Sequence, residues 1–423
     1  MDDQKQTNHE PRYEINDGSR ESEDLEEWRD PVYKEKKDRR SSIKKVIVLL
    51  LAFFIIAVTF FVPIMHMFEG PFEFGRVYPE TADFTIKRNL RFENEGPGEM
   101  NYNLTLTVPR NITEQNIQLV HDMRTDPEPG IYQKRDDHWK SWDRNLEAGR
   151  TEEIEIEYDV QTTTVHWDHS GDEAGNVEDI PEELKDRYNR DQWDVKDHQG
   201  NHLDRNGDGR LDVMIEPEHP EIREKAETIV QDEDNIYDKS RAIYDWIDEN
   251  IEYEIGREGE KPKHAYWVYD SRTGDCDEQT NLYASFSRAV GIPAWLELGV
   301  LHDRVRDSWG GHGWVRTIYV DDAGDTEFVN IDTVNDQFYF RDAHRLTTWV
   351  DDGEEGALGD FYQYVEYSGG SLVLEDDFEN LRMDTEGSVR SPEHAFIPGF
   401  GSLVAIPAIL ISLVIYHFIK KSS

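Results

Sequence analysis

Hydrophobic and polar residues alternate along the chain from about residue 75 to residue 165. Apolar side chains recur at every second position, as at Ile154, Ile156, Tyr158 and Val160. Segments rich in glycine and proline, at residues 94–98 and 126–130, separate the alternating runs. An alternating pattern interrupted by such turns is typical of β-strands in an antiparallel sheet. The pattern therefore predicts a β-sandwich-like domain over residues 75–165.

A helical pattern begins near residue 218 and gives way to a strand pattern after Pro293. Apolar residues recur every three or four positions within residues 222–229, 236–247 and 282–290. Gly291 and Pro293 end the last of these helices. Helices followed by successive strands, without βαβ units, predict an α+β domain, which we place at residues 221–375. Residues 166–220 are predicted as an acidic irregular segment, and residues 376–395 as a polar linker.

Two continuous apolar runs lie at residues 46–68 and 396–419. The first contains no Asp, Glu, Lys or Arg, and its 23 residues are long enough to cross a hydrocarbon core of about 30 Å. Basic residues precede the first run, and Lys420 and Lys421 follow the second. The positive-inside rule then places both ends in the cytoplasm. We expect a disordered cytoplasmic tail at residues 1–45 and a two-ended anchor in the cell membrane, with the domains between facing outside.

Each apolar run has an alternative interpretation. The first could be a cleaved signal peptide, but a hydrophilic lead of 45 residues and the lack of a small-residue cleavage site favour an uncleaved helix. The second opens with Pro398-Gly399-Phe400, which resembles the C-terminal sorting signals of archaeal surface proteins. That resemblance implies removal by a sortase-like membrane enzyme. Retention as a second anchor remains open.

The chain is strongly acidic, with 90 acidic against 46 basic residues and a formal net charge of −44. Nucleic acid is excluded as a partner, because phosphate binding needs a basic face. Charge spread over the whole chain favours a high-salt environment, as in halophilic archaea, where ions screen the repulsion. Asn103 and Asn111 lie in N-x-T sequons, so an exported domain would offer them for glycosylation; unused sequons are the alternative.

One acidic loop follows the D-x-N-x-D-G-x-x-D pattern of calcium sites. Its candidate ligands are Asp204, Asn206, Asp208, the carbonyl of Arg210, and Asp212. Gly209 permits the sharp turn between them. The loop departs from an EF-hand at the last ligand position, where Ile215 stands and Glu216 comes one residue late. We expect a structural calcium ion here and no cofactor for catalysis.

The single cysteine, Cys276, lies in a Gly-Asp-Cys-Asp turn at the start of a predicted helix. The positive end of the peptide dipoles favours a thiolate at this position, whereas a small buried core residue is the alternative. His312 begins a predicted strand and Asp332 ends the next one. Adjacent antiparallel strands can bring two such residues together. The three residues therefore predict a nucleophile, a base and an orienting acceptor.

Four local sequences resemble the core of the transglutaminase-like superfamily over residues 220–345. They are Gly274-Asp275-Cys276, the helix end from Arg288 to Ala294, His312-Gly313-Trp314-Val315, and Ile331-Asp332. The resemblance implies an α+β papain-like fold and a triad of Cys276, His312 and Asp332. The chain departs from the family at Gly313, where alanine is common, and at Thr333, where proline is frequent. The preceding β domain is similar to β-rich domains found before microbial cores.

The resemblance implies acyl transfer at a peptide or carboxamide carbonyl of a protein or peptide substrate. The backbone N–H of Cys276 is the expected oxyanion donor, and Trp267 or Tyr266 could supply a second. Gln279 lies one turn after Cys276, in the cleft or on the helix surface. An outward-facing cysteine peptidase is the favoured interpretation. A cross-linking transglutaminase and a catalytically silent adhesion or assembly module are the alternatives, and the oligomeric state stays open.

Overall fold

The computed structural model describes residues 76–131, 136, 138–192, 213–254, 262–353, 357–362 and 364–391, which all belong to one compact unit. The predicted cytoplasmic tail, both apolar runs and the loop from residue 204 to 212 lie outside these residues. Within them, no helix is both long enough and apolar enough to cross a membrane.

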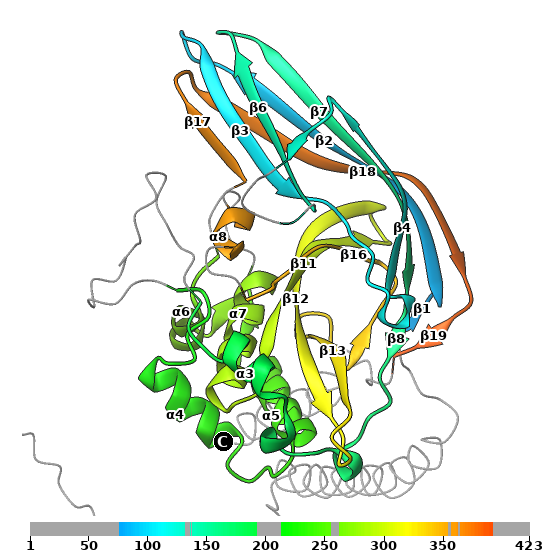
Figure 1. The fold of residues 1–423 in the computed structure, drawn as a ribbon, viewed down its shortest axis with the longest axis vertical. Helices are drawn as coiled ribbons and strands as arrows, with labels where there is room; N and C mark the ends of the chain where they lie inside the picture. The colour runs from blue at the N-terminus through cyan, green and yellow to red at the C-terminus, as the bar shows by residue number, and fades with distance from the viewer. Residues whose placement is uncertain are drawn as a thin grey trace, which may run out of the picture. The chain divides into compact units, whose positions relative to one another are not determined.

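Two four-stranded antiparallel sheets form a β-sandwich (Figure 1). One sheet has the order β17-β3-β6-β5, with bounds Val365–Ser368, Met100–Thr107, Trp139–Leu146 and Gly130–Ile131. The other has the order β18-β2-β7-β4, with bounds Leu372–Glu386, Thr81–Asn94, Thr151–Thr163 and Gln118–Asp126. Alternate residues of β2 and β7 are buried between the sheets, as the sequence period predicts.

The C-terminal part of the described chain differs from the predicted linker over residues 376–395. Strand β18 pairs with β2 along its whole length, from Leu372 opposite Asn94 to Glu386 opposite Thr81. Beyond it, β19 (Val389–Arg390) pairs with β1 (Val77–Tyr78). Acidic side chains on the exposed face of β18, and a shift of register between Asn380 and Arg382, obscure its alternating pattern. The α+β domain is therefore an insertion between strands of the sandwich.

The inserted domain packs helices against one five-stranded sheet (Figure 1). The sheet has the order β14-β13-β12-β11-β16, with bounds Gln337–Phe338, Thr326–Asp332, Ser308–Val320, Ala294–Asp303 and Arg345–Val350. The helices are α4 (Pro220–Ile229), α5 (Ile236–Asn250), α6 (Ala265–Ser271) and α7 (Cys276–Ala289). Helix α7 is buried along nearly its whole length among the other helices and strands β11 and β12. The domain is α+β, as predicted.

Shorter elements connect the two domains. Val300, Trp309 and Leu346 of the five-stranded sheet belong to the hydrophobic core of the sandwich. The segment predicted as irregular contains η3 (Gly171–Glu173), η4 (Val177–Asp179) and α3 (Glu182–Tyr188). The remaining elements are η2 (Glu114–Asn116), β8 (Val165–His166), β9 (Glu252–Tyr253), β10 (Thr273–Gly274), β15 (Phe340–Arg341) and α8 (Ala357–Tyr362). Strand β15 pairs with β8, which joins the sandwich to the sheet domain.

Candidate active site

Cys276 is the first residue of α7, and a capping box fixes the turn before it. The Asp275 carboxylate accepts the backbone N–H groups of Asp277 at 3.1 Å and Glu278 at 3.2 Å. The Glu278 carboxylate accepts the Asp275 N–H at 3.1 Å in return. Such reciprocal bonds satisfy donors that a helix start leaves unpaired. The thiol therefore sits at a defined helix N-terminus, where it is partly exposed.

His312 and Asp332 lie on neighbouring strands and pair directly. The His312 Nε2 atom is 2.6 Å from Oδ2 of Asp332, and both residues are buried. Strands β12 and β13 run antiparallel, with Val315 opposite Ile331 at the last paired position. His312 and Asp332 pair just beyond that position, where the first part of β12 lies beside the end of β13.

The next residue of β12 connects this pair to the nucleophile. The Gly313 backbone N–H donates a hydrogen bond to the Cys276 sulfur. The structure thus brings together the three residues that the sequence singled out. Because Nε2 of His312 is committed to Asp332, Nδ1 is the ring nitrogen left to act as a base.

Residues 223–333 match the family model described as the transglutaminase-like superfamily. The chain therefore carries a transglutaminase-like domain. This segment runs from α4 to the residue after β13 and contains Cys276, His312 and Asp332. No curated protein matches the chain.

Several solved structures are similar to the chain. A proposed cysteine protease from Cytophaga hutchinsonii has 14% identity and a TM-score of 0.49, over 76% of this chain and 97% of that one. The periplasmic domain of TgpA from Pseudomonas aeruginosa has 14% identity and a TM-score of 0.25, over 57% and 72%. A proposed protease from Parabacteroides distasonis has 15% identity and a TM-score of 0.23, over 59% and 43%.

In the transglutaminase-like domain, Asp332 accepts hydrogen bonds at both carboxylate oxygens. Its Oδ2 atom lies 2.6 Å from the Arg345 guanidinium and accepts the Asn335 side-chain amide at 2.9 Å. Its Oδ1 atom accepts the backbone N–H groups of Val334 and Asn335, each at 3.1 Å. Burial would raise the pKa of Asp332, but Arg345 and His312 hold that pKa well below its usual range. Asp332 is therefore ionised at neutral pH.

Arg345 was not predicted from the sequence, although it is central to the site. It lies on β16, is fully buried, and also contacts the Asp342 carboxylate at 3.2 Å. Its guanidinium stacks 5.2 Å from the Trp314 ring. A charged residue in a strand whose residues are all buried was the available signal. Sequence spacing could not show that Asp332 is the partner of Arg345, because their strands, β13 and β16, are separated in the sheet by β12 and β11.

The prediction that the helix N-terminus lowers the pKa of the Cys276 thiol is wrong. Burial raises this pKa well above its ordinary value, and the carboxylates of Asp277, Asp275 and Asp332 raise it further. The Asp277 carboxylate is 3.8 Å from the sulfur. Burial and these carboxylates outweigh the Gly313 hydrogen bond, which acts in the opposite direction. The resting nucleophile is a protonated thiol that needs a base.

Asp277 is a second carboxylate at the nucleophile, and the family departure at Gly313 makes room for it. A Cβ atom at Gly313 would lie 2.6 Å from Oδ1 of Asp277. Burial, together with the neighbouring Asp275, raises the pKa of Asp277 to about 6. Tyr362 of α8 is partly buried and interacts with this carboxylate. Alanine in place of Gly313 would displace this group.

Gln279 is buried, and its side chain joins two parts of the site. Its Nε2 atom donates to the Gly274 carbonyl at 3.1 Å, and its Oε1 atom accepts the Thr333 hydroxyl at 3.1 Å. The expectation of a place on the helix surface is wrong, because the residue is 3% exposed. Thr333, the second departure from the family, thus ties the end of β13 to the nucleophile turn.

Tyr266 and Trp267, the predicted second oxyanion donors, make contacts with other residues in the structure. The Tyr266 N–H donates to Glu216 at 2.6 Å, and its hydroxyl donates to Glu221 at 3.1 Å. Trp267 is 38% exposed and lies under the Lys263 ammonium group. A part for either residue as a second oxyanion donor stays a prediction. The backbone N–H of Cys276 remains the expected oxyanion donor.

An exposed tyrosine that the sequence did not mark lies beside the nucleophile turn. Tyr253 of β9 pairs with Gly274 of β10, two residues before Cys276. Its side chain is 49% exposed. Partial burial, together with Cys276 and nearby carboxylates, raises the pKa of Tyr253 to about 12. This aromatic ring is therefore available to a substrate at the mouth of the site.

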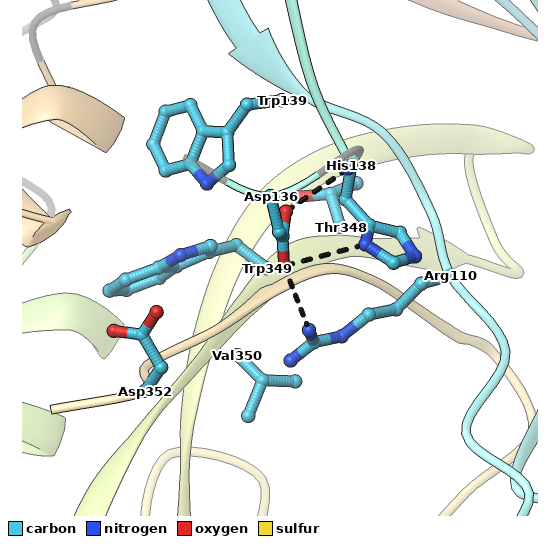
Figure 2. A pocket seen from close by; sticks show the side chains of 8 residues that line it. All are labelled: Arg110, Asp136, His138, Trp139, Thr348, Trp349, Val350 and Asp352. Carbon is cyan, nitrogen blue, oxygen red and sulfur yellow. Dashed lines mark hydrogen bonds and ion pairs between the residues drawn. The ribbon is translucent and has the colours of Figure 1, made fainter. Parts of the chain in front are cut away.

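A pocket lies where the sandwich meets β16 (Figure 2). Its lining residues are Arg110, Asp136, His138, Trp139, Thr348, Trp349, Val350 and Asp352. Asp136 is 3.7 Å from Arg110 and 3.5 Å from His138, as the dashed lines show. Asp136 and Arg110 form an ion pair, and the lining includes none of the three triad residues. We assign the pocket no part in the chemistry.

The remaining predicted sites stay predictions. The candidate calcium ligands lie outside the described residues, within which no group of three or more His, Cys, Asp or Glu side chains could hold a metal ion. Asn103 bonds across the sheet to Ser141 at 3.0 Å and Asp143 at 2.6 Å, so a glycan there would break those bonds. Asn111 is exposed and is the more accessible sequon.

Proposed function

We propose that this chain is a thiol enzyme that cleaves or transfers acyl groups at peptide or carboxamide bonds of proteins, with Cys276 as the nucleophile. The observation that carries the proposal is the 2.6 Å pairing of His312 with Asp332, next to a sulfur that accepts the Gly313 N–H. A nucleophile, a base and an orienting acceptor at one site are the parts that covalent acyl transfer needs.

The raised thiol pKa determines how the first step proceeds. His312 removes the thiol proton as the sulfur attacks the carbonyl carbon, and Asp332 stabilises the imidazolium through its Nε2–H. The carbonyl oxygen becomes an oxyanion that accepts the backbone N–H of Cys276 at the start of α7. His312 then gives the proton to the leaving amine, and a thioester remains on Cys276.

Water or an acceptor amine then resolves the thioester, with His312 again acting as the base. We favour water, because no described residue marks an amine-binding site. This makes a cysteine peptidase the first proposal and a cross-linking transglutaminase the alternative. A catalytically silent adhesion or assembly module is disfavoured, since the Asp332 carboxylate pairs with His312 and is held in place by four further hydrogen-bond or charge contacts.

One experiment separates these functions. The full-length protein is incubated with an unstructured, glutamine-bearing protein, with and without a labelled primary amine. Peptidase activity produces new amino termini, cross-linking incorporates the label, and a silent module does neither. The Cys276→Ala variant must lose whichever activity is found; an activity that survives this substitution would refute the proposed nucleophile.

We also propose that the apolar runs at residues 46–68 and 396–419 anchor the chain in lipid, with the catalytic domain outside. This rests on their length and on the lysines that flank them. A membrane-impermeant maleimide applied to intact cells tests the topology through Cys276, the single thiol. Labelling only after lysis would contradict this topology.

Thermal melting with and without a chelator tests whether the loop from Asp204 to Asp212 binds calcium. An unchanged melting temperature would contradict a bound calcium ion.

A further inference from the structure

The first and last described residues of the chain meet at one place, where β1 pairs with β19 (Figure 1). The Ser391 N–H also donates to the Arg76 carbonyl at 2.9 Å. The apolar run of residues 396–419 begins five residues after Ser391, and even a fully extended chain of that length spans at most about 18 Å. The run of residues 46–68 ends eight residues before Arg76. Any membrane that holds these runs is therefore close to β1 and β19.

The turn between β11 and β12 lies against the same place. The Arg304 guanidinium donates to the Val77 carbonyl of β1 at 3.2 Å. On the other side of the turn, the Asn380 side-chain amide of β18 donates to the Asp307 carboxylate at 3.1 Å. We call β1, β19 and residues 304–306 the ribbon end of the protein.

Exposed aliphatic side chains gather at or beside the ribbon end. Val305 is 95% exposed, Val77 is 49% exposed, and Leu381, next to the strand residue that contacts the turn, is 44% exposed. Of the large aliphatic residues that are exposed in the described ranges, only Val373 lies elsewhere. An exposed arginine flanks Val305 on each side. An apolar side chain between two cations suits the headgroup region of a bilayer, where the cations meet lipid phosphates.

Arg76, the residue before β1, joins the ribbon end to the catalytic pair. Its guanidinium donates to the Asn335 carbonyl at 3.2 Å and contacts the Asp336 carboxylate at 3.0 Å. The Asn335 side-chain amide in turn lies 2.9 Å from Oδ2 of Asp332 and 3.0 Å from Nε2 of His312. Only two side chains separate the ribbon end from the catalytic pair, so a surface that the ribbon end touches is also near the active site.

We propose that the ribbon end rests on the bilayer in which the apolar runs are anchored, so that the enzyme acts on polypeptide segments close to the membrane. The inference rests on the proposed anchoring and on the proposed function of Cys276, whose substrate class it names. The occupant is the chain's own membrane rather than a second copy or a soluble partner, because both apolar runs come within eight residues of this surface. Tethering raises the effective concentration of the two surfaces, so a contact of low intrinsic affinity suffices.

A fluorescent label at position 305 tests the contact without turnover. The full-length protein is reconstituted in vesicles of phosphatidylcholine and phosphatidylglycerol. Cys276→Ala removes the only native thiol, so Val305→Cys alone carries an NBD label. Lipids with a nitroxide near the headgroup quench this label only at close range. Val373→Cys is the matched control, because Val373 lies eight residues before Leu381 on β18, roughly 27 Å away.

We expect the nitroxide lipids to quench the label at position 305 severalfold more strongly than the label at position 373. Equal quenching at the two positions, or none at position 305, would overturn the inference. Protein that does not float with the vesicles in a density gradient would refute the anchoring and this inference together.

Turnover tests the substrate class. The wild-type protein in the same vesicles receives an unstructured, labelled casein peptide that is linked to lipid either directly or through a long, rigid polyproline spacer. At equal surface density, we expect the directly linked peptide to be turned over about tenfold faster, because only this peptide is held at the height of the active site. Equal turnover of the two peptides would overturn the substrate class. Quenching at position 305 without turnover of either peptide supports the membrane contact and means that only the proposed function fails.

Discussion

Two carboxylates flank the same cysteine–histidine pair, and their pKa values shift in opposite directions. Asp332 meets the Arg345 guanidinium at 2.6 Å and four further donors, and its pKa falls. Asp277 lies near Tyr362 and the carboxylates of Asp275 and Glu278, and its pKa rises to about 6. Burial acts on both groups in the same direction. The difference shows that the partners of a carboxylate, rather than its depth, decide its charge.

The opposite shifts suit different tasks. Asp332 stays ionised and can orient His312 and stabilise its charged form. Asp277 titrates near neutral pH and lies 3.8 Å from the sulfur, where its charge opposes formation of the thiolate. One region of the site thus holds a fixed negative charge, and the other holds a charge that depends on pH.

The same substitution in both regions gives the largest contrast. We expect Asp332→Asn to lower kcat/KM by roughly 10³-fold or more, as for loss of the orienting acceptor of a triad. Asp277→Asn should retain activity, because Asp277 does not orient the base. Circular dichroism checks that both variants fold. Comparable losses in the two variants would mean that the carboxylates share one role.

Removing the cation from the Asp332 region should have the next largest effect. Arg345→Met leaves Asp332 and Asp342 buried without their shared partner, which costs about 3–5 kcal/mol in the free energy of unfolding. Denaturant unfolding at pH 7 measures it. The matched control is Arg91→Met. Arg91 forms a surface ion pair with Glu375, so this substitution should cost far less stability than Arg345→Met.

The pH dependence of that loss has a definite sign. The folded-state pKa of Asp332 lies below its unfolded value, so its contribution to stability is present above about pH 4 and is lost as the pH falls through the folded-state pKa. The destabilisation by Arg345→Met should therefore shrink on acidification below pH 4. A loss of stability that is the same at pH 3 and pH 7 would contradict the ion-pair interpretation and indicate lost packing against Trp314.

The triad could be predicted because each member lies at the end of an element with a local signature. A capping Asp275 marks the start of the cysteine helix, and alternating apolar residues mark the strands that carry His312 and Asp332. The sandwich was predicted for the same reason. Its C-terminal strand β18 was missed, because acidic residues occupy its exposed face and a change of register interrupts its period.

What the sequence did not reveal depends on contacts between distant segments. The bonds from Gln279 to Thr333 and from Arg345 to Asp332 join elements that become neighbours only in the folded sheet. The thiol pKa was wrongly predicted for a related reason. The helix dipole is a local property, whereas the burial and the carboxylates that oppose it come from the packing of α7 against β12 and β13.

Asp277→Asn should stabilise the protein at high pH and change little at low pH. The folded-state pKa of Asp277, about 6, lies above its unfolded value near 3.9, so stability is lost as the pH rises through 6. The amide should recover about 1–3 kcal/mol at pH 8 and nearly none at pH 4. Thermal melting at both values measures it. Equal changes at both pH values would show that charge is not the cause.

The same variant should speed alkylation of Cys276 by iodoacetamide severalfold at pH 8, because the thiol loses a nearby negative charge. The groups that face Asp277 are Asp275, Cys276 and Glu278 of its own helix region, Tyr253 of β9, His312 of β12 and Tyr362 of α8. Asp275→Asn is an unsuitable control, since Asp275 caps the helix. The control is Glu366→Gln on the exposed strand β17, which removes one negative charge as Asp277→Asn does but leaves the active site intact.

The smallest effect is expected for Tyr362→Phe, which removes one hydroxyl from the Asp277 region. The interaction with Tyr362 lowers the pKa of Asp277 against the effect of burial, so its loss should raise that pKa further. We expect the alkylation rate of Cys276 to inflect near pH 6, and Tyr362→Phe should move this inflection up by at most about one pH unit, because an interaction that lowers the pKa of Asp277 is lost. Phenylalanine keeps the packing of α8, so the melting temperature at pH 4 is the control. An inflection that stays at the same pH would show that Tyr362 only fills space, and that burial and the neighbouring carboxylates alone determine the pKa of Asp277.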